Sequence, residues 1–397
     1  MISQAIILAG GKGSRLGVLT KNTPKPLLKI SGKPFIEYLI WNLARQGIEE
    51  IIIMTGFMSE SFLKNYHNKS FFGSKVKIYN EDQPLGTAGC LVANLDKLDE
   101  KFWVINGDSF FDCNLLQTYQ LHQDTNGAVI IGTRSQEVQR FGSINYDEKM
   151  QINGFSEKNK TLSEGVINSG IYLIQKFLLN DFAEGFLSME YDVLPKLIID
   201  KNLKLDIQDG YFIDIGVPES FKKANKDFPD IITKPALFLD RDGTLNIDNG
   251  YTHKIEDLEF IDGVFSSLIK AINKGFYIIL ITNQGGIAKG LFTKDDMQKF
   301  NKKIIKELRL KGANIDYVYF CEHHPDAIDE TQRECACRKP KSGMILQALN
   351  ELPIKLSGSF MVGDKHSDIK AGESAGVKSL LFDEANLENF LTKHGVI

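Results

Sequence analysis

Residues 4–17 read QAIILAGGKGSRLG and join an apolar run directly to a glycine-rich loop. The run AIILA is too short for a signal peptide or a membrane span and is typical of a buried strand. Glycine at positions 10, 11, 13 and 17 lets backbone N–H groups converge on an anion, because no Cβ blocks close approach. The stretch predicts the first strand of an α/β domain and a loop that can hold phosphate. A tight turn without a ligand is the alternative.

Helical and strand patterns alternate after this loop. A helical apolar pattern covers residues 34–47, and strand patterns follow at 49–55, 75–80 and 101–108. Such βαβ alternation predicts a mostly parallel sheet covered by helices.

A second opening of the same kind begins at residue 236 with ALFLDRDGTLN. Strand patterns follow at 276–283, 315–320 and 358–364, with helices expected from Gly263, Thr293 and Ser342. Between the two openings, residues 222–235 mix charge with two prolines and show no clear apolar period, which favours a linker. We therefore predict two α/β domains, residues 1–225 and 236–397, joined by a linker at 226–235.

The composition is that of an ordinary globular protein, with 43% hydrophobic and 25% charged residues among 397. A net charge of −4 gives no sign of binding to nucleic acid or to an anionic membrane. Five cysteines without an export signal predict a cytoplasmic protein, in which closely spaced cysteines indicate metal binding more often than disulfides.

Two cations accompany the first glycine-rich loop. Arg15 lies within it, and Lys25 lies between two prolines in TPKPLL, which hold that segment extended. The loop has neither the GxxxxGK[ST] spacing nor the GxGxxG spacing. Fixed cations beside converging amides suit a polyphosphate.

The first 225 residues resemble the sugar-1-phosphate nucleotidyltransferase family. The loop matches LAGGxGTRL except that Ser14 replaces threonine, and further motifs follow in order: EDQPLGTAG (81–89), INGDS (105–109), GFSEK (154–158), INSGIYLI (167–174) and FIDIGVPE (212–219). Enzymes of this family join a sugar phosphate to the α-phosphorus of a nucleoside triphosphate and release pyrophosphate.

The resemblance implies a role for each matching residue. Arg15 and Lys25 would hold the reacting phosphates, Asp108 and Asp214 would hold Mg²⁺, and Asp108 would also contact the substrate. The residues implied in sugar binding are Glu157, Lys158 and Asn168. The residues implied in nucleotide binding are Leu8, Ala9, Gly10, Gly11, Gly13, Ser14, Arg15, Lys25, Gln83, Gly86 and Thr87. Lys158 also fits a solvated lysine in the charged run EKNK.

The second opening places Asp240 and Asp242 at the end of an apolar strand. A calcium loop of the EF-hand type is the alternative, but such a loop needs a preceding helix and a DxDxDG spacing, and neither is present. Asp-x-Asp-Gly-Thr resembles the nucleophile motif of the haloacid dehalogenase superfamily, and downstream motifs supply Thr282, Asn283, Arg338, Lys339, Asp364 and Asp368. The fold class expected is thus a Rossmann-like nucleotidyltransferase fold followed by a haloacid-dehalogenase-like fold.

This second resemblance implies covalent phosphoryl transfer. Asp240 would attack phosphorus, and Asp242 would serve as general acid and base. Mg²⁺ would bind Asp240, the backbone carbonyl of Asp242, and Asp364, while Thr282 and Lys339 would cradle the phosphate. The other residues implied in substrate binding are Asn283, Arg338 and Lys365.

A third feature is the spacing C-x-H-x₁₁-C-x-C within residues 321–337. Cys321, His323, Cys335 and Cys337 form the four-ligand set of a structural zinc site, with no position left for an activated water. Chance clustering is the alternative, but four potential ligands within seventeen residues argue against it. His324 in place of His323 is a second alternative for the histidine ligand.

The motifs of the second half resemble those of the heptose-1,7-bisphosphate 7-phosphatases, with the histidinol-phosphate phosphatases as the nearest relatives. The first half is most similar to the heptose-1-phosphate guanylyltransferases. The fusion favours a bifunctional enzyme of activated-heptose synthesis that uses sugar phosphates and a nucleoside triphosphate. One alternative is a hexose-1-phosphate guanylyltransferase joined to a phosphatase of broad specificity. The other is a protein in which one of the two domains does not catalyse a reaction. The nucleobase, the anomer and the oligomeric state, a homo-oligomer included, stay open.

Overall fold

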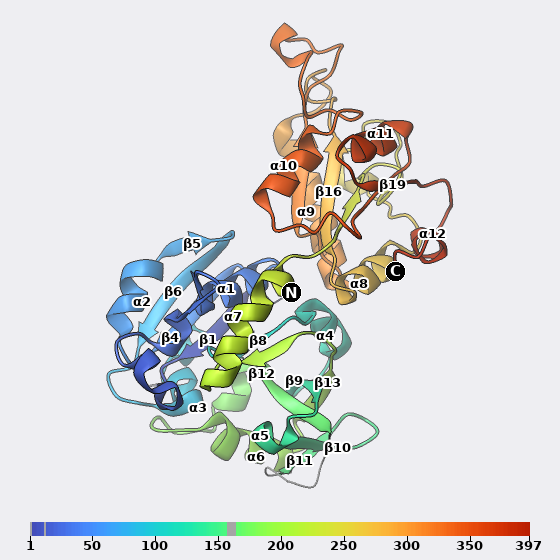
Figure 1. The fold of residues 1–397 in the computed structure, drawn as a ribbon. Coiled ribbons are helices and arrows are strands. Elements are labelled where there is room, and N and C mark those ends of the chain that lie inside the picture. Colours follow the sequence, from blue (N-terminus) through green and yellow to red (C-terminus); the bar gives the residue numbers. More distant parts are fainter. Residues whose placement is uncertain (1, 12, 157–163) are drawn as a thin grey trace. The chain divides into compact units, whose positions relative to one another are not determined.

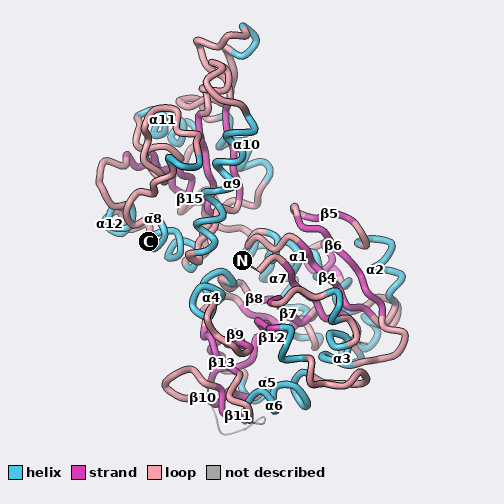
Figure 2. The backbone as a smooth tube through the Cα atoms, turned by 180° about the vertical axis from the view of Figure 1, so that it is seen from behind, coloured by secondary structure: helices cyan, strands magenta, loops and turns pink. Residues whose placement is uncertain are grey.

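The computed structural model describes residues 2–11, 13–156 and 164–397, and the chain divides into two compact units, Met1–Pro229 and Asp230–Ile397 (Figure 1). In each unit the strands form the interior and the helices lie outside them (Figure 2). Among the described residues, no helix is both long enough and apolar enough to span a bilayer.

The first unit is built on an eight-stranded sheet with the order β13-β9-β12-β7-β1-β4-β6-β5. The strands are β1 (Gln4–Ala9), β4 (Glu50–Thr55), β5 (Lys69–Phe71), β6 (Ser74–Asn80), β7 (Lys101–Asn106), β9 (Ala128–Ser135), β12 (Gly165–Gln175) and β13 (Leu203–Ile207). The central strands β7, β1, β4 and β6 are parallel, as the alternating pattern predicts. Their apolar runs are buried along nearly their whole length, which is typical of a sheet covered on both faces.

Strand β12 is an antiparallel member of this mostly parallel sheet, since it runs antiparallel to both of its neighbours, β7 and β9. An antiparallel strand needs no crossover helix, so the helix-strand alternation of the sequence carried no sign of its direction. The short strands β8 (Ser109–Phe111) and β14 (Phe212–Asp214) pair separately from the large sheet.

Seven α-helices are described in this unit. They are α1 (Phe35–Ala44), α2 (Ser59–Tyr66), α3 (Gly86–Val92), α4 (Leu115–His122), α5 (Val138–Phe141), α6 (Leu194–Ile199) and α7 (Pro218–Ile232).

Helix α7 corrects the prediction of a linker, because it continues through most of residues 222–235. Phe228 is fully buried and packs against the rings of Phe35 and Tyr38. Pro229 lies inside the helix and cannot donate to the carbonyl of Asn225. The Ser31 hydroxyl donates to that carbonyl instead, at 3.0 Å. A tertiary hydrogen bond thus compensates for the proline that made the segment read as a linker.

The second unit has a parallel five-stranded sheet with the order β17-β16-β15-β18-β19. The strands are β15 (Ala236–Leu239), β16 (Tyr277–Asn283), β17 (Tyr317–Cys321), β18 (Phe360–Gly363) and β19 (Lys378–Leu381). The helices are α8 (Val264–Asn273), α9 (Lys294–Leu310), α10 (Gly343–Glu351), α11 (His366–Ser374) and α12 (Leu387–Lys393). Gly263, Thr293 and Ser342 cap α8, α9 and α10, which confirms the predicted starts. Because β15 lies between β16 and β18, the residues that follow these three strands meet at one edge of the sheet.

Candidate active sites and metal centre

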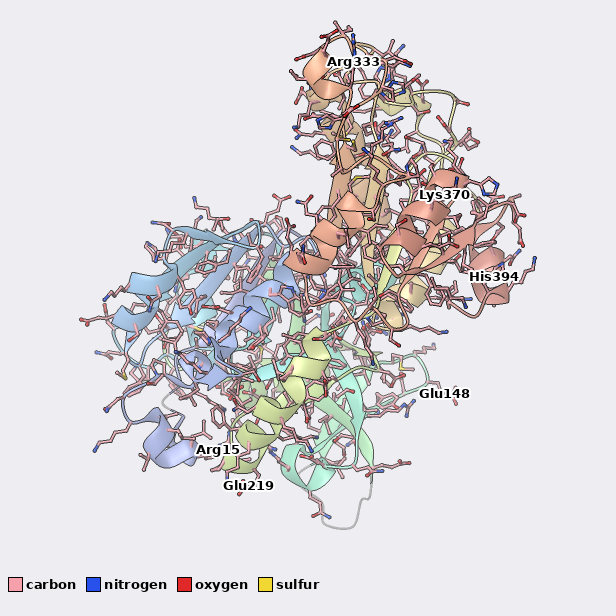
Figure 3. The ribbon with its side chains drawn as sticks, turned by 45° about the horizontal axis from the view of Figure 1, so that its top comes forward. Arg15, Glu148, Glu219, Arg333, Lys370 and His394 are labelled. Carbon is pink, nitrogen blue, oxygen red and sulfur yellow. The ribbon has the colours of Figure 1, made fainter. Side chains whose placement is uncertain are left out.

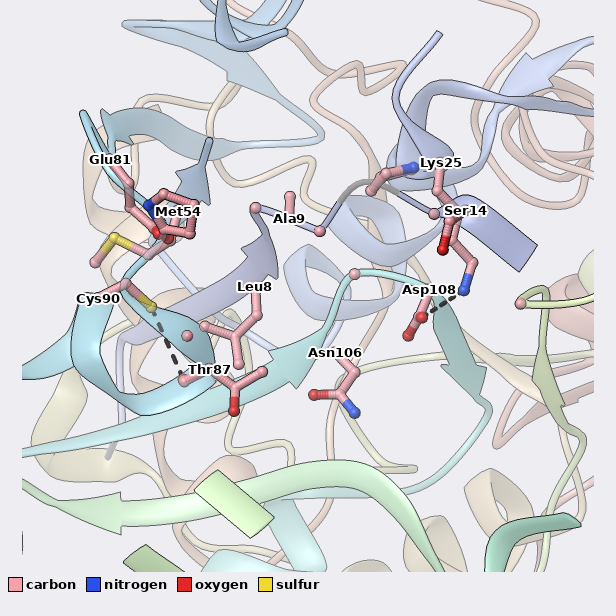
Figure 4. Close-up of a pocket in the computed structure, with 18 of the residues that line it drawn as sticks. Leu8, Ala9, Ser14, Lys25, Met54, Glu81, Thr87, Cys90, Asn106 and Asp108 are labelled. Atoms are coloured by element: carbon pink, nitrogen blue, oxygen red, sulfur yellow. Dashed lines mark hydrogen bonds and ion pairs between the residues drawn. The ribbon is translucent and has the colours of Figure 1, made fainter. Parts of the chain in front are cut away.

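A pocket of about 560 Å³ opens in the first unit above the carboxyl ends of β1 and β7 (Figure 4). Its lining includes all but Gln83 of the residues predicted to bind nucleotide: Leu8, Ala9, Gly10, Gly11, Gly13, Ser14, Arg15, Lys25, Gly86 and Thr87. Arg15 belongs to the turn Ser14–Thr20 that follows the glycine-rich loop (Figure 3). The loop read first in the sequence therefore forms one wall of this pocket.

The opposite wall requires glycine for close backbone approach. Gly86 has a φ of +77°, and a Cβ there would lie 2.4 Å from the carbonyl oxygen of Leu187. The Thr87 hydroxyl accepts from the Met189 N–H at 2.8 Å and lies 3.3 Å from Glu190. The motif LGTAG is thus held against the segment that carries Glu190, which also lines the pocket.

Charged groups of both signs converge at Gly216. A Cβ on this glycine would lie 2.7 Å from Asp214 Oδ1, 2.9 Å from Lys25 Nζ and 3.2 Å from Arg15 Nη2. Lys25 is buried, and its Nζ pairs with Asp108 Oδ2 at 2.5 Å. Two carboxylates and two cations in one pocket provide ligands for a divalent ion and partners for phosphate oxygens.

Arg140 is a member of this site that the sequence did not reveal. Its Nη2 forms an ion pair with Asp214 Oδ1 and also donates to the Asp214 carbonyl at 3.2 Å. The backbone N–H of Gly216 donates to the same carboxylate oxygen at 2.8 Å. These contacts fix the orientation of Asp214. Because they join segments 74 residues apart, no spacing in the sequence signals them.

Glu81 is a second residue without a predicted role. It lines the pocket, and its Oε2 accepts from the Leu85 N–H at 2.9 Å. Burial raises the pKa of Glu81, and the hydrogen bond from Leu85 partly opposes that shift. Its position in the motif EDQPLGTAG, five residues before Gly86, is the sequence feature that could have indicated its place in the pocket.

The predicted sugar-binding residues are less well placed. Asn168 donates to the Tyr172 hydroxyl at 2.8 Å and accepts from the Gly170 N–H at 2.9 Å. It is not among the described residues that line the pocket. Glu157 and Lys158 lie outside the described residues.

The second unit gathers its charged residues where β15, β16 and β18 end. Lys339 Nζ lies 2.7 Å from Asp240 Oδ1 and 2.7 Å from Asp368 Oδ1, and it donates to the Ile281 carbonyl at 2.8 Å. All three charged side chains are buried. Burial raises the pKa of Asp240, and the ion pair with Lys339 opposes that shift.

Asp240, Asp364 and Asp368 offer carboxylate oxygens within 4.8 Å of one another, a set that can hold a metal ion. Asp364 Oδ1 is buried and, within the described part of the chain, has no hydrogen-bond partner. Burial raises the pKa of Asp364 to about 6; Lys365 opposes the shift, and the carboxylates of Asp240 and Asp368 add to it. An unpartnered oxygen among buried carboxylates fits a divalent cation.

The side chain of Asp242 lies outside that carboxylate set, which contains Asp368 in its place. Its oxygens accept from Arg241, from Asn246 at 3.1 Å and from Gln284 at 3.1 Å. The contribution predicted for Asp242 toward a metal was its backbone carbonyl, which this arrangement of the side chain does not affect.

The other predicted substrate residues surround this edge. Thr282 is buried and its hydroxyl accepts from Gln284 at 2.8 Å. Asn283 holds the backbone of Lys339, and Arg338 donates to the His323 carbonyl at 3.0 Å. The exposed side chain of Lys365 lies 3.4 Å from Asp248. Lys339 thus lies beside Asp240, and the Thr282 hydroxyl is held by Gln284.

The predicted cysteine and histidine ligands come together in space. Cys321, His323, Cys335 and Cys337 offer ligand atoms within 4.8 Å of one another. The Cys321 sulfur lies 3.6 Å from that of Cys335, 3.0 Å from that of Cys337 and 3.7 Å from His323 Nδ1. This cluster can hold a metal ion. The Arg338 N–H donates to the Cys335 sulfur at 3.4 Å, which connects the cluster to the loop carrying Lys339.

Comparison with known proteins identifies the class of each unit. Residues 4–230 match the nucleotidyl transferase family, and residues 336–386 match the HAD-hydrolase-like family. The chain belongs to the nucleotidyl transferase family, and its second unit is HAD-like. HAD-like phosphatases use Mg²⁺, which agrees with the carboxylate set of Asp240, Asp364 and Asp368.

Individual relatives narrow these classes. Over 225 residues the chain is 37% identical to the D-glycero-alpha-D-manno-heptose 1-phosphate guanylyltransferase of Campylobacter jejuni, covering 55% of this chain and 96% of that protein. Over 144 residues it is 45% identical to the D-glycero-beta-D-manno-heptose-1,7-bisphosphate 7-phosphatase of Photorhabdus laumondii, covering 36% of this chain and 77% of that protein. The crystal structure of HddC from Yersinia pseudotuberculosis complexed with GMP-PN is similar with a TM-score of 0.52 and 33% identity, covering 57% of this chain and all of that one.

Proposed function

We propose that the chain is a bifunctional enzyme that prepares a nucleotide-activated heptose. The second unit removes the 7-phosphate of D-glycero-D-manno-heptose 1,7-bisphosphate, and the first unit transfers GMP from GTP to the resulting heptose 1-phosphate. The observation that carries the proposal is that one chain holds a pocket lined by the glycine-rich loop and, in its other unit, a set of buried carboxylates beside Lys339, and that each unit has a relative named for one of these two steps. We propose that residues 226–235 separate the nucleotidyltransferase domain from the phosphatase domain.

In the phosphatase, Asp240 attacks the phosphorus of the 7-phosphate and forms an aspartyl phosphate. Asp242 protonates the departing sugar oxygen and then accepts a proton from the attacking water. Thr282 and Lys339 hold the phosphate oxygens. Asp240, Asp364 and the Asp242 carbonyl, with Asp368 near, would hold Mg²⁺, and the ion would neutralise charge at the phosphate.

In the nucleotidyltransferase, catalysis rests on positioning and on charge neutralisation. Arg15 and Lys25 hold the triphosphate where they converge at Gly216. Asp108 and Asp214 are the proposed ligands of Mg²⁺, which neutralises phosphate charge when bound. Gln83, Asn168, Glu157 and Lys158 remain proposed contacts to the base and the sugar.

We further propose that the Cys321 cluster holds a structural Zn²⁺. Three thiolates and one imidazole saturate a tetrahedral ion, so the metal organises the loop that presents Arg338 and Lys339. Reduced thiolates and a nucleoside triphosphate substrate both suit a cytoplasmic enzyme.

Both steps must use the same anomer at C1. The phosphatase relatives are named for a β-bisphosphate, whereas the guanylyltransferase relative is named for an α-1-phosphate. Removing the 7-phosphate breaks no bond at C1, so both units must act on the same configuration for the product to pass from one to the other. We propose the α anomer.

The test is a single panel of assays on the full chain. Each anomer of heptose 1,7-bisphosphate is supplied and phosphate release is followed, and heptose 1-phosphate or mannose 1-phosphate is then supplied with GTP, ATP, CTP or UTP while pyrophosphate is followed. We expect phosphate from the α-bisphosphate and pyrophosphate from heptose 1-phosphate with GTP. Faster turnover of mannose 1-phosphate would support a hexose-1-phosphate guanylyltransferase instead.

A further inference from the structure

Arg241, between the two motif aspartates, is a fully buried arginine. Its Nε and Nη2 donate to the two oxygens of Asp242 at 2.9 and 2.7 Å. Nη2 also donates to the Thr252 carbonyl at 2.7 Å, and Nη1 donates to Asn301 at 3.1 Å. The guanidinium carbon lies 4.8 Å from the centre of the Phe300 ring. Every face of this side chain is therefore in contact with protein.

Burial of a guanidinium is costly unless its charge and its donors are satisfied. The planar fork of Arg241 meets the planar carboxylate of Asp242 through two parallel hydrogen bonds, and this geometry fixes the plane of the carboxylate as well as its position. Thr252 and Asn301 fix the guanidinium in turn, since they belong to other segments of the unit.

The proposed reaction needs a carboxyl group in a defined orientation. In the first step Asp240 forms a bond to phosphorus, the bond from phosphorus to the sugar oxygen breaks, and its electron pair stays on that oxygen, which takes the proton of Asp242. In the second step water bonds to phosphorus and gives a proton to Asp242, the bond from phosphorus to Asp240 breaks, and inorganic phosphate leaves. Both proton transfers depend on where the Asp242 oxygens point.

We infer that Arg241 is a positioning residue that orients Asp242 for proton transfer to the sugar leaving group; this inference rests on the proposed phosphatase function. Gln284 supports the same orientation, because its Nε2 donates to Asp242 Oδ2 at 3.1 Å and to the Thr282 hydroxyl at 2.8 Å. The amide therefore connects the acid-base residue to the proposed phosphate cradle.

The experiment compares two leaving groups in single turnovers with the full chain in excess. A sugar oxygen must be protonated as it leaves, whereas p-nitrophenolate leaves readily as an anion. We expect Arg241→Met to slow release of heptose 1-phosphate from the bisphosphate by at least about tenfold, since general acid catalysis contributes about 10²–10⁴. The rate of p-nitrophenolate release from p-nitrophenyl phosphate should stay within about threefold of the wild-type rate. For each substrate, the variant should reach its maximal rate over the same concentration range as the wild type. Arg309→Met, an arginine in α9 outside the site, is the matched control and should change neither rate.

Arg241→Lys keeps the buried charge and serves if Arg241→Met does not fold. One ammonium group cannot hold both carboxylate oxygens in a plane, so we expect the same selective loss for the sugar substrate. Equal losses for both substrates, or wild-type rates for both in Arg241→Lys, would overturn the positioning role. Wild-type chain that releases phosphate from neither substrate would refute the proposed phosphatase itself, and the inference with it, without any variant.

Discussion

The side-chain amide of Asn283 holds the backbone of Lys339 by two hydrogen bonds. Its Nδ2 donates to the Lys339 carbonyl at 3.0 Å, and its Oδ1 accepts from the Lys339 N–H at 3.1 Å. The two residues are 56 positions apart, at the end of β16 and after the cysteine and histidine cluster. Asn283 was predicted to contact substrate, and its observed contacts give it the task of placing the lysine that pairs with Asp240.

We therefore predict that Asn283→Ala lowers phosphatase turnover by roughly ten- to a hundredfold, because two hydrogen bonds are each worth about 0.5–1.5 kcal/mol. Phosphate release from heptose 1,7-bisphosphate measures the effect. Asn389→Ala, in the exposed part of α12, is the control and should be neutral. Wild-type turnover in Asn283→Ala would show that Lys339 holds its place without this amide.

Replacement of Asp240 by asparagine should abolish phosphate release and leave nucleotidyl transfer intact. Asparagine cannot form the aspartyl phosphate. The fold should persist, because Lys339 retains its ion pair with Asp368. Pyrophosphate release from GTP and heptose 1-phosphate is measured on the same preparation. Loss of both activities in a folded variant would contradict the assignment of the two reactions to separate units.

The residues at strand ends were predictable from sequence because they follow apolar runs within short motifs. Asp240 follows β15, Thr282 is the second-last residue of β16 and Asp364 follows β18. Parallel neighbours bring their carboxyl ends to one edge, so local patterns were enough to anticipate these contacts. The cluster of three cysteines and one histidine could be predicted equally well, since all four residues lie within a stretch of seventeen.

Other contacts could not be predicted, because they depend on packing between distant segments. Arg140 contacts Asp214, which lies 74 residues further along the chain. The segment predicted to be a linker is helical, and its Phe228 packs against aromatic rings of other segments.

Removal of metal from the Cys321 cluster should impair the phosphatase alone. We expect about one zinc ion per chain, and we expect Cys335→Ser to lose it together with phosphatase activity, because the cluster supports the loop of Arg338 and Lys339. Elemental analysis and phosphate release measure the two effects, and nucleotidyl transfer should continue. Cys113→Ala, which alters a buried thiol of the first unit, should keep its zinc. Active wild-type protein without zinc would refute this prediction.

Glu81 should determine the preference for GTP. Guanine presents N–H groups at N1 and N2, and a carboxylate can accept from both, whereas uracil, cytosine and adenine lack this pair. We expect Glu81→Gln to reduce the ratio of kcat/KM for GTP over ATP by roughly ten- to a hundredfold, as a bidentate contact is worth about 1–3 kcal/mol. The exposed Glu60→Gln is the control. An unchanged ratio would assign base selection to other residues.

Replacement of Arg15 by alanine should stop the pathway between its two steps. Arg15 Nη2 and Lys25 Nζ both approach Gly216, where they can hold the triphosphate, and loss of one preorganised charged contact costs about 2.7–4 kcal/mol of transition-state stabilisation. We therefore expect pyrophosphate release to fall by at least about a hundredfold.

The residues proposed for the phosphatase all belong to the second unit, so the same variant should still consume heptose 1,7-bisphosphate. Given that substrate and GTP together, Arg15→Ala should accumulate heptose 1-phosphate, which also establishes that dephosphorylation comes first. Lys21→Ala removes a neighbouring exposed cation that does not line the pocket, and it should form GDP-heptose at the wild-type rate. If Arg15→Ala also forms GDP-heptose at nearly the wild-type rate, the loop at residues 8–17 does not hold the triphosphate through this arginine.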